Sequence, residues 1–245
     1  ITLKCPQCGE AMQRVTDLID VWFDSGAMPL AQWHYPFENK KLIDSGEQYP
    51  ADFIVEAIDQ TRGWFYTLLA IATALGRKLP YKNVMVLGHT LDEKGQKMSK
   101  SKGNVIMAHD ALEKFGADVT RWYLFTLSDP ADGKPISPKE IEAKFRGFFG
   151  TLQNTLRFLE LYSVNTQLSG SPKAATELDH WLYARLAQLT TVVTEKLDQY
   201  APTSAARAIE EFVVNDLSNW WVRRSRGRFQ RPVNDEQLVY VASVL

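Results

Sequence analysis

The sequence has few cysteines, no excess of either charge and no long apolar run. Two cysteines in 245 residues exclude a disulfide framework and favour a reducing, cytoplasmic compartment. A formal net charge of -1 means that an anion must be bound by a local basic cluster. No apolar run could cross a bilayer, and the polar stretch TLKCPQCGE after Ile1 is not a signal peptide. Because the first residue is not Met, we expect a piece of a longer polypeptide.

The two cysteines form a C-x-x-C motif. Cys5 and Cys8 flank Pro6 in the stretch CPQCGE, which resembles one knuckle of a zinc ribbon. A structural Zn²⁺ takes four ligands, and the four histidines are scattered along the chain. We therefore expect half of a zinc site, with its other ligands upstream of Ile1. The alternative is an exposed turn with two free thiols.

Two apolar runs flank a helical pattern between residues 52 and 89. DFIVEAI (52–58) predicts a buried strand, and NVMVLGH (83–89) predicts a second strand. The residues between them keep an apolar face at helical spacing up to Gly76, a plausible C-cap. Strand, helix and strand predict a βαβ unit with parallel strands. Ligands bind at the carboxyl ends of such strands, so we expect EAIDQ (56–60) and the loop after residue 89 at this edge.

The rest of the chain has a helical pattern without repeats. Gly116 breaks the first stretch into two short helices. Thr203 or Ser204 is the expected N-cap of a later helix. The pattern predicts an α-helical bundle. The expected helices cover residues 108–127, 137–162, 177–199, 203–228 and 234 onward, with a loop at 129–138 and a linker at 164–176.

One short segment, LDEKGQKMSKSKGNV (91–105), carries four lysines among glycines and serines. Lysines on a mobile loop beside the carboxyl edge of a parallel sheet can close over a polyphosphate and neutralise a leaving pyrophosphate. The alternative is a solvated basic loop without a ligand.

The order of residues in this loop carries a family resemblance. KMSKS (97–101) resembles the second signature of class I aminoacyl-tRNA synthetases. DVWFDSG (20–26), YPADFIVEAIDQTRGWFYTLL (49–69) and DEKGQKMSKSKGNV (92–105) stand in the order of the isoleucyl-tRNA synthetases. NDLSNWWVRRSRGRF (215–229) resembles the anticodon-binding helical domain of that family.

The resemblance implies an α/β part followed by an all-α part. Residues 1–18 would be the zinc-knuckle-like end of an upstream insertion. Residues 19–110 would be the second half of a Rossmann-like nucleotide-binding fold with the KMSKS loop. Residues 111–170 would be a helical connector, and residues 171–245 a truncated anticodon-binding bundle.

The family's earlier HIGH-type signature and its editing insertion have no counterpart in this sequence. The resemblance therefore implies a fragment of an isoleucine–tRNA ligase, inactive alone and monomeric. The parent would use isoleucine, tRNA(Ile) and ATP with Mg²⁺, and the cysteine pair would bind part of a Zn²⁺ site. The alternatives are a valine- or leucine-specific relative, or a non-catalytic RNA-binding module derived from one.

The resemblance also implies roles for individual residues of the loop. Lys97 and Lys100 would face the phosphates as catalytic residues, and Lys100 would contact the transition state. Met98 would pack the loop down, while Ser99 and Ser101 would hydrogen-bond phosphate or backbone.

The strand–helix junction supplies the other expected substrate contacts. Glu56 would be a buried carboxylate that touches the aminoacyl-adenylate, because a buried charge must be paired or bind something. Asp59 and Gln60 would contact the ribose, although Asp59 could instead be a helix N-cap. Trp22 and Trp64 would wall the isoleucine pocket, or they would simply be core aromatics.

A basic cluster near the C-terminus predicts RNA contact. We expect Trp220 and Trp221 to be core residues. We expect part of the cluster to contact tRNA phosphates, and another part to pair with carboxylates such as Glu210, Glu211 or acids of another helix. The alternative is a solvated face. The predicted tRNA-binding residues are Arg223, Arg224, Arg226 and Arg228, with Arg231 beyond them.

Overall fold

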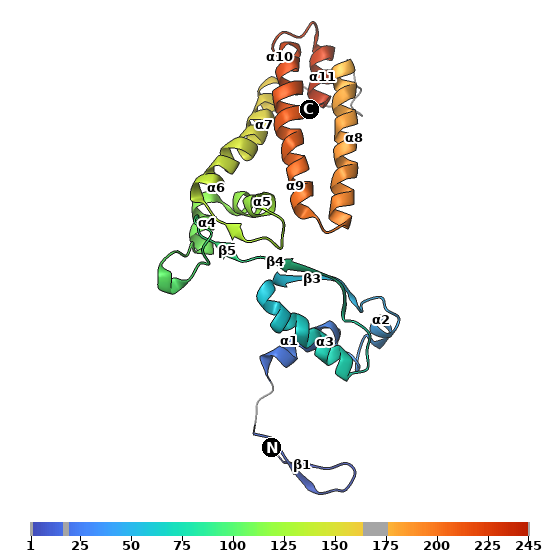
Figure 1. Ribbon diagram of the computed structural model, residues 1–245. Coiled ribbons are helices and arrows are strands. Elements are labelled where there is room, and N and C mark those ends of the chain that lie inside the picture. The colour runs from blue at the N-terminus through green and yellow to red at the C-terminus, as the bar shows by residue number, and fades with distance from the viewer. Residues whose placement is uncertain (1, 17–19, 164–175, 245) are drawn as a thin grey trace. The chain divides into compact units, whose positions relative to one another are not determined.

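The computed structural model describes residues 2–16, 20–163 and 176–244 (Figure 1). The chain forms two compact units, Ile1–Leu87 and Gly88–Leu245. The first unit is mixed α/β and the second is mainly helical.

The first unit opens with a small hairpin. Strand β1 (Thr2–Lys4) pairs antiparallel with β2 (Ala11–Gln13), and Leu3 lies opposite Met12. Every residue of both strands is exposed. The cysteine motif lies in the connecting turn, so the hairpin serves to present that turn.

The βαβ unit predicted from the sequence is confirmed. Strand β3 (Ala51–Ala57) pairs in parallel with β4 (Tyr81–Leu87), and the 3-10 turn η1 (Ile58–Arg62) and helix α3 (Trp64–Ala74) connect them. Gly76 ends the helix at φ +65°, a conformation that costs glycine little. The N–H of Arg77 donates to the carbonyl of Ala72, and that of Gly76 to Thr73, which is a Schellman cap.

The expected burial of β3 is wrong. Ile54 is buried against Phe65 and Leu68 of α3, but Phe53 and Val55 are 48% and 37% exposed. Successive side chains of a strand point to opposite faces. The face with Phe53 and Val55 stays open in the part of the chain that the structure describes, so the apolar run does not mean burial on both faces.

Two more helices complete the first unit. Helix α1 (Val21–Ala31) packs against α3, and α2 (Lys40–Asp44) lies further along the chain. A Cβ on Gly26 would lie 2.9 Å from the backbone of Thr67, so only glycine permits this close packing of α1 on α3.

The second unit begins with two very short strands. Strand β5 (Thr90–Leu91) pairs in parallel with β6 (Lys134–Pro135), so part of the predicted loop 129–138 is a strand. Helices α4 (Ala108–Phe115) and α5 (Ala117–Leu127) are separated at Gly116, as predicted. Val119, Tyr123, Ile136 and Ile141 form the core here.

Two long, interrupted helical runs and two further helices build the bundle. The first run comprises α6 (Pro138–Lys144), the π-helical η3 (Phe145–Phe149) and α7 (Gly150–Ser163). The second comprises α9 (Pro202–Glu211), the π-helical η4 (Phe212–Val222) and α10 (Arg223–Gln230). Helix α8 (Glu177–Asp198) packs along α9 and η4, and α11 (Asp235–Val244) packs on α10 (Figure 1). Except for Thr176, the predicted linker 164–176 lies outside the described residues.

The expected cap of the third bundle helix is wrong. Helix α9 begins at Pro202, and its N-cap Ala201 has no side-chain hydrogen bond. Proline fits the first helical position because its missing N–H would be unpaired there anyway. The hydroxyl of Thr203 instead donates to the carbonyl of Ser128, 3.0 Å away, and ties α9 to the segment after α5.

The bundle core is aromatic. Trp221 is fully buried and Phe229 nearly so, and their rings lie edge to face at 6.2 Å. The Trp122 ring stacks on Phe148 at 4.9 Å. Phe148 belongs to the same core as Trp221 and Phe229, and Trp122 of α5 packs against it, so the helices of residues 111–170 share one interior with the later helices.

Candidate functional site

The two cysteines lie in a tight turn that backbone hydrogen bonds close. The N–H of Gly9 donates to the Cys5 carbonyl, and that of Cys5 to Glu10. Backbone N–H groups of Cys8 and Gln7 point at the Cys5 sulfur and, with the Cys8 side chain, lower the pKa of its thiol. A lowered pKa favours the thiolate that binds metal. Both cysteines are free, and the described residues contain no group of three or more His, Cys, Asp and Glu placed to share an ion.

The carboxyl edge of the sheet carries Glu56, Asp59 and Gln60. Ala57 and Leu87 are partners at the ends of β3 and β4, so both strands finish at this edge. The expected burial of Glu56 is wrong: its side chain is exposed, because this end of the sheet is not covered in the described part of the unit. Exposure leaves the carboxylate accessible to a ligand, but burial no longer argues for one.

Gln60, and not Asp59, caps the first turn of α3. The Gln60 Oε1 accepts a hydrogen bond from the N–H of Trp64 at 2.8 Å. Gln60 is half-buried and Asp59 is exposed at the same turn. The ribose contacts predicted for the two residues remain predictions.

Trp22 and Trp64 lie at neighbouring ends of α1 and α3. The Trp64 Nε1 donates to the Ser25 carbonyl at 3.1 Å. A Cβ on Gly63 would lie 3.3 Å from Cη2 of Trp22, which places that ring beside the first turn of α3. Trp22 is 40% exposed, so it is not a core residue in this unit.

The KMSKS segment is a loop of the second unit. Met98 packs against the core of Val119, Tyr123, Ile136 and Ile141, as predicted. Lys97 is exposed, and its backbone bridges Leu91. The hydroxyls of Ser99 and Ser101 lie 3.3 Å apart. The backbone of Lys100 lies in the 3-10 turn η2 (Lys100–Lys102). Its side chain lies outside the described part of the structure.

The basic cluster divides into two groups. Arg223, Arg224 and Arg226 are exposed on α10. The expectation that Trp220 is core is wrong: it is 44% exposed, and the Arg224 guanidinium lies 3.7 Å from its ring centroid. Such a cation–π pair forms where an aromatic ring stays at the surface. Trp221, one residue later, is fully buried as predicted.

Arg228 belongs to the interior. Its Nη1 and Nη2 donate to the two carboxylate oxygens of Asp179 at 2.7 and 2.8 Å. Asp179 is fully buried and also accepts from Trp221 Nε1 at 3.0 Å. This bidentate pair is the expected bond to another helix's carboxylate, because Asp179 lies on α8 and not on the arginine helix. It gives Arg228 a structural role.

Comparison with known families decides the assignment. Residues 3–136, more than half of the chain, match the family described as tRNA synthetases class I (I, L, M and V). The chain belongs to this family. Residues 179–245 match the anticodon-binding domain of tRNA ligase.

Relatives with curated names are isoleucine–tRNA ligases. The protein from Cytophaga hutchinsonii is 50% identical over 90% of this chain, and that from Dehalococcoides mccartyi strain CBDB1 is 48% identical over 96%. The chain spans only 20% and 24% of these two proteins.

Solved structures show the same fold at low identity. Mycobacterium tuberculosis methionyl-tRNA synthetase in complex with methionyl-adenylate aligns with a TM-score of 0.72 and 20% identity, over 98% of this chain and 46% of that one. A LeuRS from Agrobacterium radiobacter K84, in a ternary complex with tRNA and LeuAMS, aligns at 0.69 and 21%, over 99% and 30%. None of the helices described in the chain is long and apolar enough to span a bilayer.

Asp92 and Asn104, which the sequence did not single out, shape the loop that carries KMSKS. The Asn104 Oδ1 accepts from the Ser99 N–H at 2.9 Å, and Asn104 Nδ2 donates to Asp92 Oδ2 at 2.9 Å. Asp92 Oδ1 accepts from the N–H groups of Lys94 and Gln96. Asp and Asn at the two ends of a glycine-containing loop are a turn signal that could have found them.

An open cavity of about 540 Å³ adjoins this loop. Lys94 and Lys102 line it together with Asp92, Glu93 and Asn104. Two lysines and two carboxylates balance in its lining, so the KMSKS loop has open space beside it without an excess of positive charge there.

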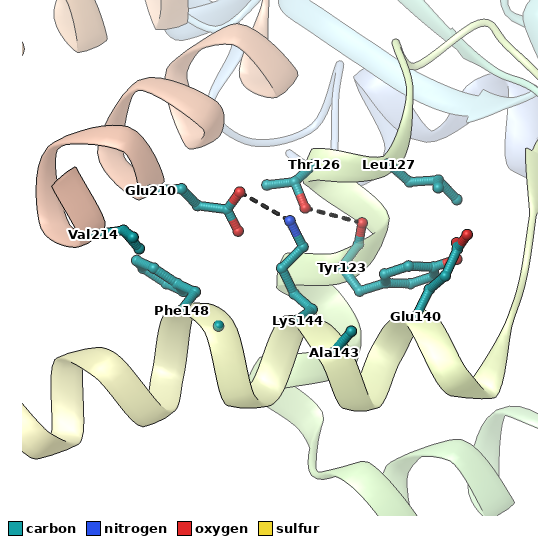
Figure 2. Close-up of a pocket in the computed structure, with 10 residues that line it drawn as sticks. Tyr123, Thr126, Leu127, Glu140, Ala143, Lys144, Phe148, Glu210 and Val214 are labelled. Carbon is teal, nitrogen blue, oxygen red and sulfur yellow. Dashed lines mark hydrogen bonds and ion pairs between the residues drawn. The ribbon is translucent and has the colours of Figure 1, made fainter.

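A second cavity, of about 480 Å³, lies between the connector and the bundle (Figure 2). Figure 2 shows Lys144 reaching toward Glu210, 2.9 Å away, and Glu210 also accepts from Trp122 Nε1 at 2.8 Å. The Tyr123 hydroxyl lies 2.9 Å from Glu140, and burial raises the pKa of Tyr123 to about 12. None of the predicted site residues lines this cavity, and its polar groups pair with one another across the junction.

Proposed function

We propose that the chain is part of an isoleucine–tRNA ligase and supplies its KMSKS loop and anticodon-binding helices. The observation that carries this proposal is the KMSKS segment Lys97–Ser101, in a loop beside an open cavity, in a chain about half identical to such ligases over 90% or more of its length. The parent enzyme would join isoleucine to ATP as isoleucyl-adenylate and then transfer it to tRNA(Ile).

In the first step the isoleucine carboxylate attacks the α-phosphate of ATP. A bond forms between the carboxylate oxygen and phosphorus, the α–β phosphoanhydride breaks, and pyrophosphate leaves. Negative charge grows on the leaving group, so Lys97 and Lys100 would stabilise it, with Ser99 and Ser101 donating hydrogen bonds. Mg²⁺ would be held mainly by the phosphates, as it commonly is when few carboxylates are nearby.

The carboxyl edge of β3 would hold the rest of the adenylate. Glu56 is exposed there and could receive the substrate ammonium, while Asp59 and Gln60 would contact the ribose. Trp22 and Trp64, close to each other at the start of α3, would wall the isoleucine side chain. These assignments rest on the residues' places in the matching motifs.

The second step brings tRNA to the helical unit. Arg223, Arg224 and Arg226 are exposed in the segment that matches an anticodon-binding domain, which supports contact with RNA phosphates. Arg228 is excluded from this set, because its guanidinium is engaged by Asp179.

Cys5 and Cys8 fit half of a structural zinc site. Their turn directs backbone N–H groups at one sulfur, and two thiolates leave two ligand positions to be filled from elsewhere. Zinc there would stabilise the hairpin. Metal analysis should find about one Zn²⁺ at this site in the full-length protein and little in the 245-residue chain. A tightly held equivalent in the short chain would contradict the half-site.

Amino-acid-dependent exchange of pyrophosphate into ATP tests the proposed function. The full-length protein should exchange with isoleucine in preference to valine or leucine, and the 245-residue chain alone should not. A preference for valine or leucine would make it the corresponding relative. Absence of exchange with tRNA binding retained would make it a non-catalytic RNA-binding module.

A further inference from the structure

The signature loop is closed at its base by one side-chain pair. Asn104, at the end of the loop, uses both ends of its amide: Oδ1 accepts from the Ser99 N–H, and Nδ2 donates to Asp92, each at 2.9 Å. The same Nδ2 lies 3.5 Å from the Lys97 carbonyl. One amide therefore touches the start of the loop and two residues of the KMSKS signature.

Asp92 completes this network from the other side. Its Oδ1 accepts from the N–H groups of Lys94 and Gln96 at 2.9 and 2.8 Å, while Oδ2 accepts from Asn104. These hydrogen bonds lower the pKa of the Asp92 carboxyl, and the bond from Asn104 has the largest effect on that pKa. Asp92 thus remains an acceptor at neutral pH, and every polar atom of the pair has a defined direction.

The base of the loop is in turn fixed to the fold. The N–H of Ile136 donates to the Leu91 carbonyl, and the Ser137 hydroxyl donates to Glu93 at 2.9 Å. Met98 packs into the core below. Within this frame, the Asp92–Asn104 pair is the side-chain bond that joins the two ends of the loop.

We propose that Asp92 and Asn104 are positioning residues that hold the signature loop in the shape from which Lys97 and Ser99 meet the ATP phosphates. The inference rests on the proposed function. Neither residue needs to touch the substrate. Misplacement of catalytic groups by about 1 Å is enough to cost about 10²-fold in rate.

Asn104 donates to Asp92, so exchanging the two side chains tests the pair: each single substitution removes the match of donor and acceptor, and the double substitution restores it. Asn104→Asp places a second carboxylate against Asp92, and Asp92→Asn places two amide donors face to face. In the double variant, Asn at 92 accepts from Lys94 and Gln96 and donates to Asp at 104, which accepts from Ser99. The double variant keeps the net charge and restores all but the 3.5 Å contact to Lys97.

In the full-length protein, each single variant should lower kcat of isoleucine-dependent exchange by about 10²-fold. The KM for isoleucine should stay within twofold, and the double variant should recover most of the rate. Asp118→Asn, the same chemical change at an exposed site on α5, should have no effect. If both single variants lowered the rate and the double variant did not recover it, the proposal would be overturned.

A pH profile separates positioning from simple misfolding. In Asn104→Asp the facing carboxylates repel, so the pKa of one of them rises. Protonation then restores a donor, and the rate relative to the wild type should increase as pH falls from 8 to 6. A rate ratio that does not change with pH would contradict the pairing.

Cleavage by a lysine-specific protease gives a readout that needs no substrate. Both single variants should be cut faster at the loop lysines than the wild type and the double variant, at unchanged melting temperature. If the wild type failed to exchange with isoleucine but the cleavage order held, the proposed function would be lost and the pairing retained. Equal cleavage of all four proteins would overturn the pairing itself.

Discussion

The two units differ in where their polar side chains point. In the helical unit several charged groups bond to other side chains: the fully buried Asp179 pairs with Arg228 and accepts a hydrogen bond from Trp221. In the α/β unit Glu56 and Asp59 at the sheet edge are exposed, as are the apolar Phe53 and Val55 on its face. Residue type alone therefore does not separate a charge that holds the fold from one that is open to a ligand.

Bonds between distant segments dominate the helical unit. The Arg207 guanidinium donates to the carbonyls of Thr126 and Leu127, both at 2.9 Å, and satisfies the C-terminal end of α5. Lys144 and Trp122 both bind Glu210. Such fully paired groups stabilise one arrangement of helices, whereas the exposed Glu56 and Lys97 contribute little to folding.

The largest expected effect concerns the interior pair. Asp179→Asn leaves Arg228 without a counter-charge, and breaking a buried pair in this way costs about 3–5 kcal/mol. Denaturant unfolding of the chain should show this loss. Asp52→Asn is the matched control, because Asp52 and its partner Lys82 are 82% and 55% exposed, and it should cost ~1 kcal/mol or less. Equal losses would remove the distinction between interior and surface charges.

The same pair predicts a dependence of stability on pH. Burial acts to raise the pKa of Asp179, but the hydrogen bonds from Arg228, Thr176 and Trp221 outweigh it and lower the pKa. A lowered pKa stabilises the fold above the unfolded value of about 3.9, and this contribution is lost as pH falls through the folded pKa. The free energy of unfolding, measured from pH 6 down to pH 3, should fall more in the wild type than in Asp179→Asn. Parallel curves would contradict this assignment.

The next effect is on chemistry rather than on folding. In the full-length protein, Lys97→Ala or Lys100→Ala should lower isoleucine-dependent exchange by about 10²–10³-fold, as loss of a transition-state contact does. The free energy of unfolding should stay unchanged, since Lys97 is exposed. Lys82→Ala, which removes an exposed lysine paired with Asp52, is the control and should leave the rate unchanged. Near-normal rates in both loop variants would make the loop a solvated basic segment.

Local patterns predicted the elements well, because helices and strands depend on nearby residues. The apolar run at 52–58 and Gly76 defined β3 and the end of α3. Burial was less predictable: it depends on which elements cover a face, so Glu56 and Trp220 were misplaced. Trp220 and Trp221 are neighbours within the π-helical η4, where the angle per residue departs from the usual helix. The bond between Asp179 and Arg228 spans 49 residues and leaves no local pattern.

A smaller effect should separate the two groups of arginines. Arg223→Glu or Arg226→Glu should weaken tRNA binding about tenfold at low salt and flatten its salt dependence, because fewer counterions are released. Exchange and stability should not change. Arg228→Glu should instead destabilise the fold, since it opposes the buried Asp179. Filter binding over a salt series and denaturant unfolding distinguish the two. Neutral results for both exposed arginines would leave this surface without an RNA role.

The smallest effects expected concern two glycines, one in each unit. Gly76 has φ +65°, so Gly76→Ala should cost about 1 kcal/mol by forcing a side chain into the left-handed region. Gly227 lies inside α10, where a Cβ would meet no atom within 4 Å. Gly227→Ala should therefore stabilise the helix by about 0.5–1 kcal/mol, since alanine loses less backbone entropy. Opposite signs in denaturant unfolding would confirm that Gly76 is needed for its backbone conformation, whereas Gly227 is not. If Gly227→Ala left stability unchanged while weakening tRNA binding, the glycine would instead mark a close approach of RNA to α10.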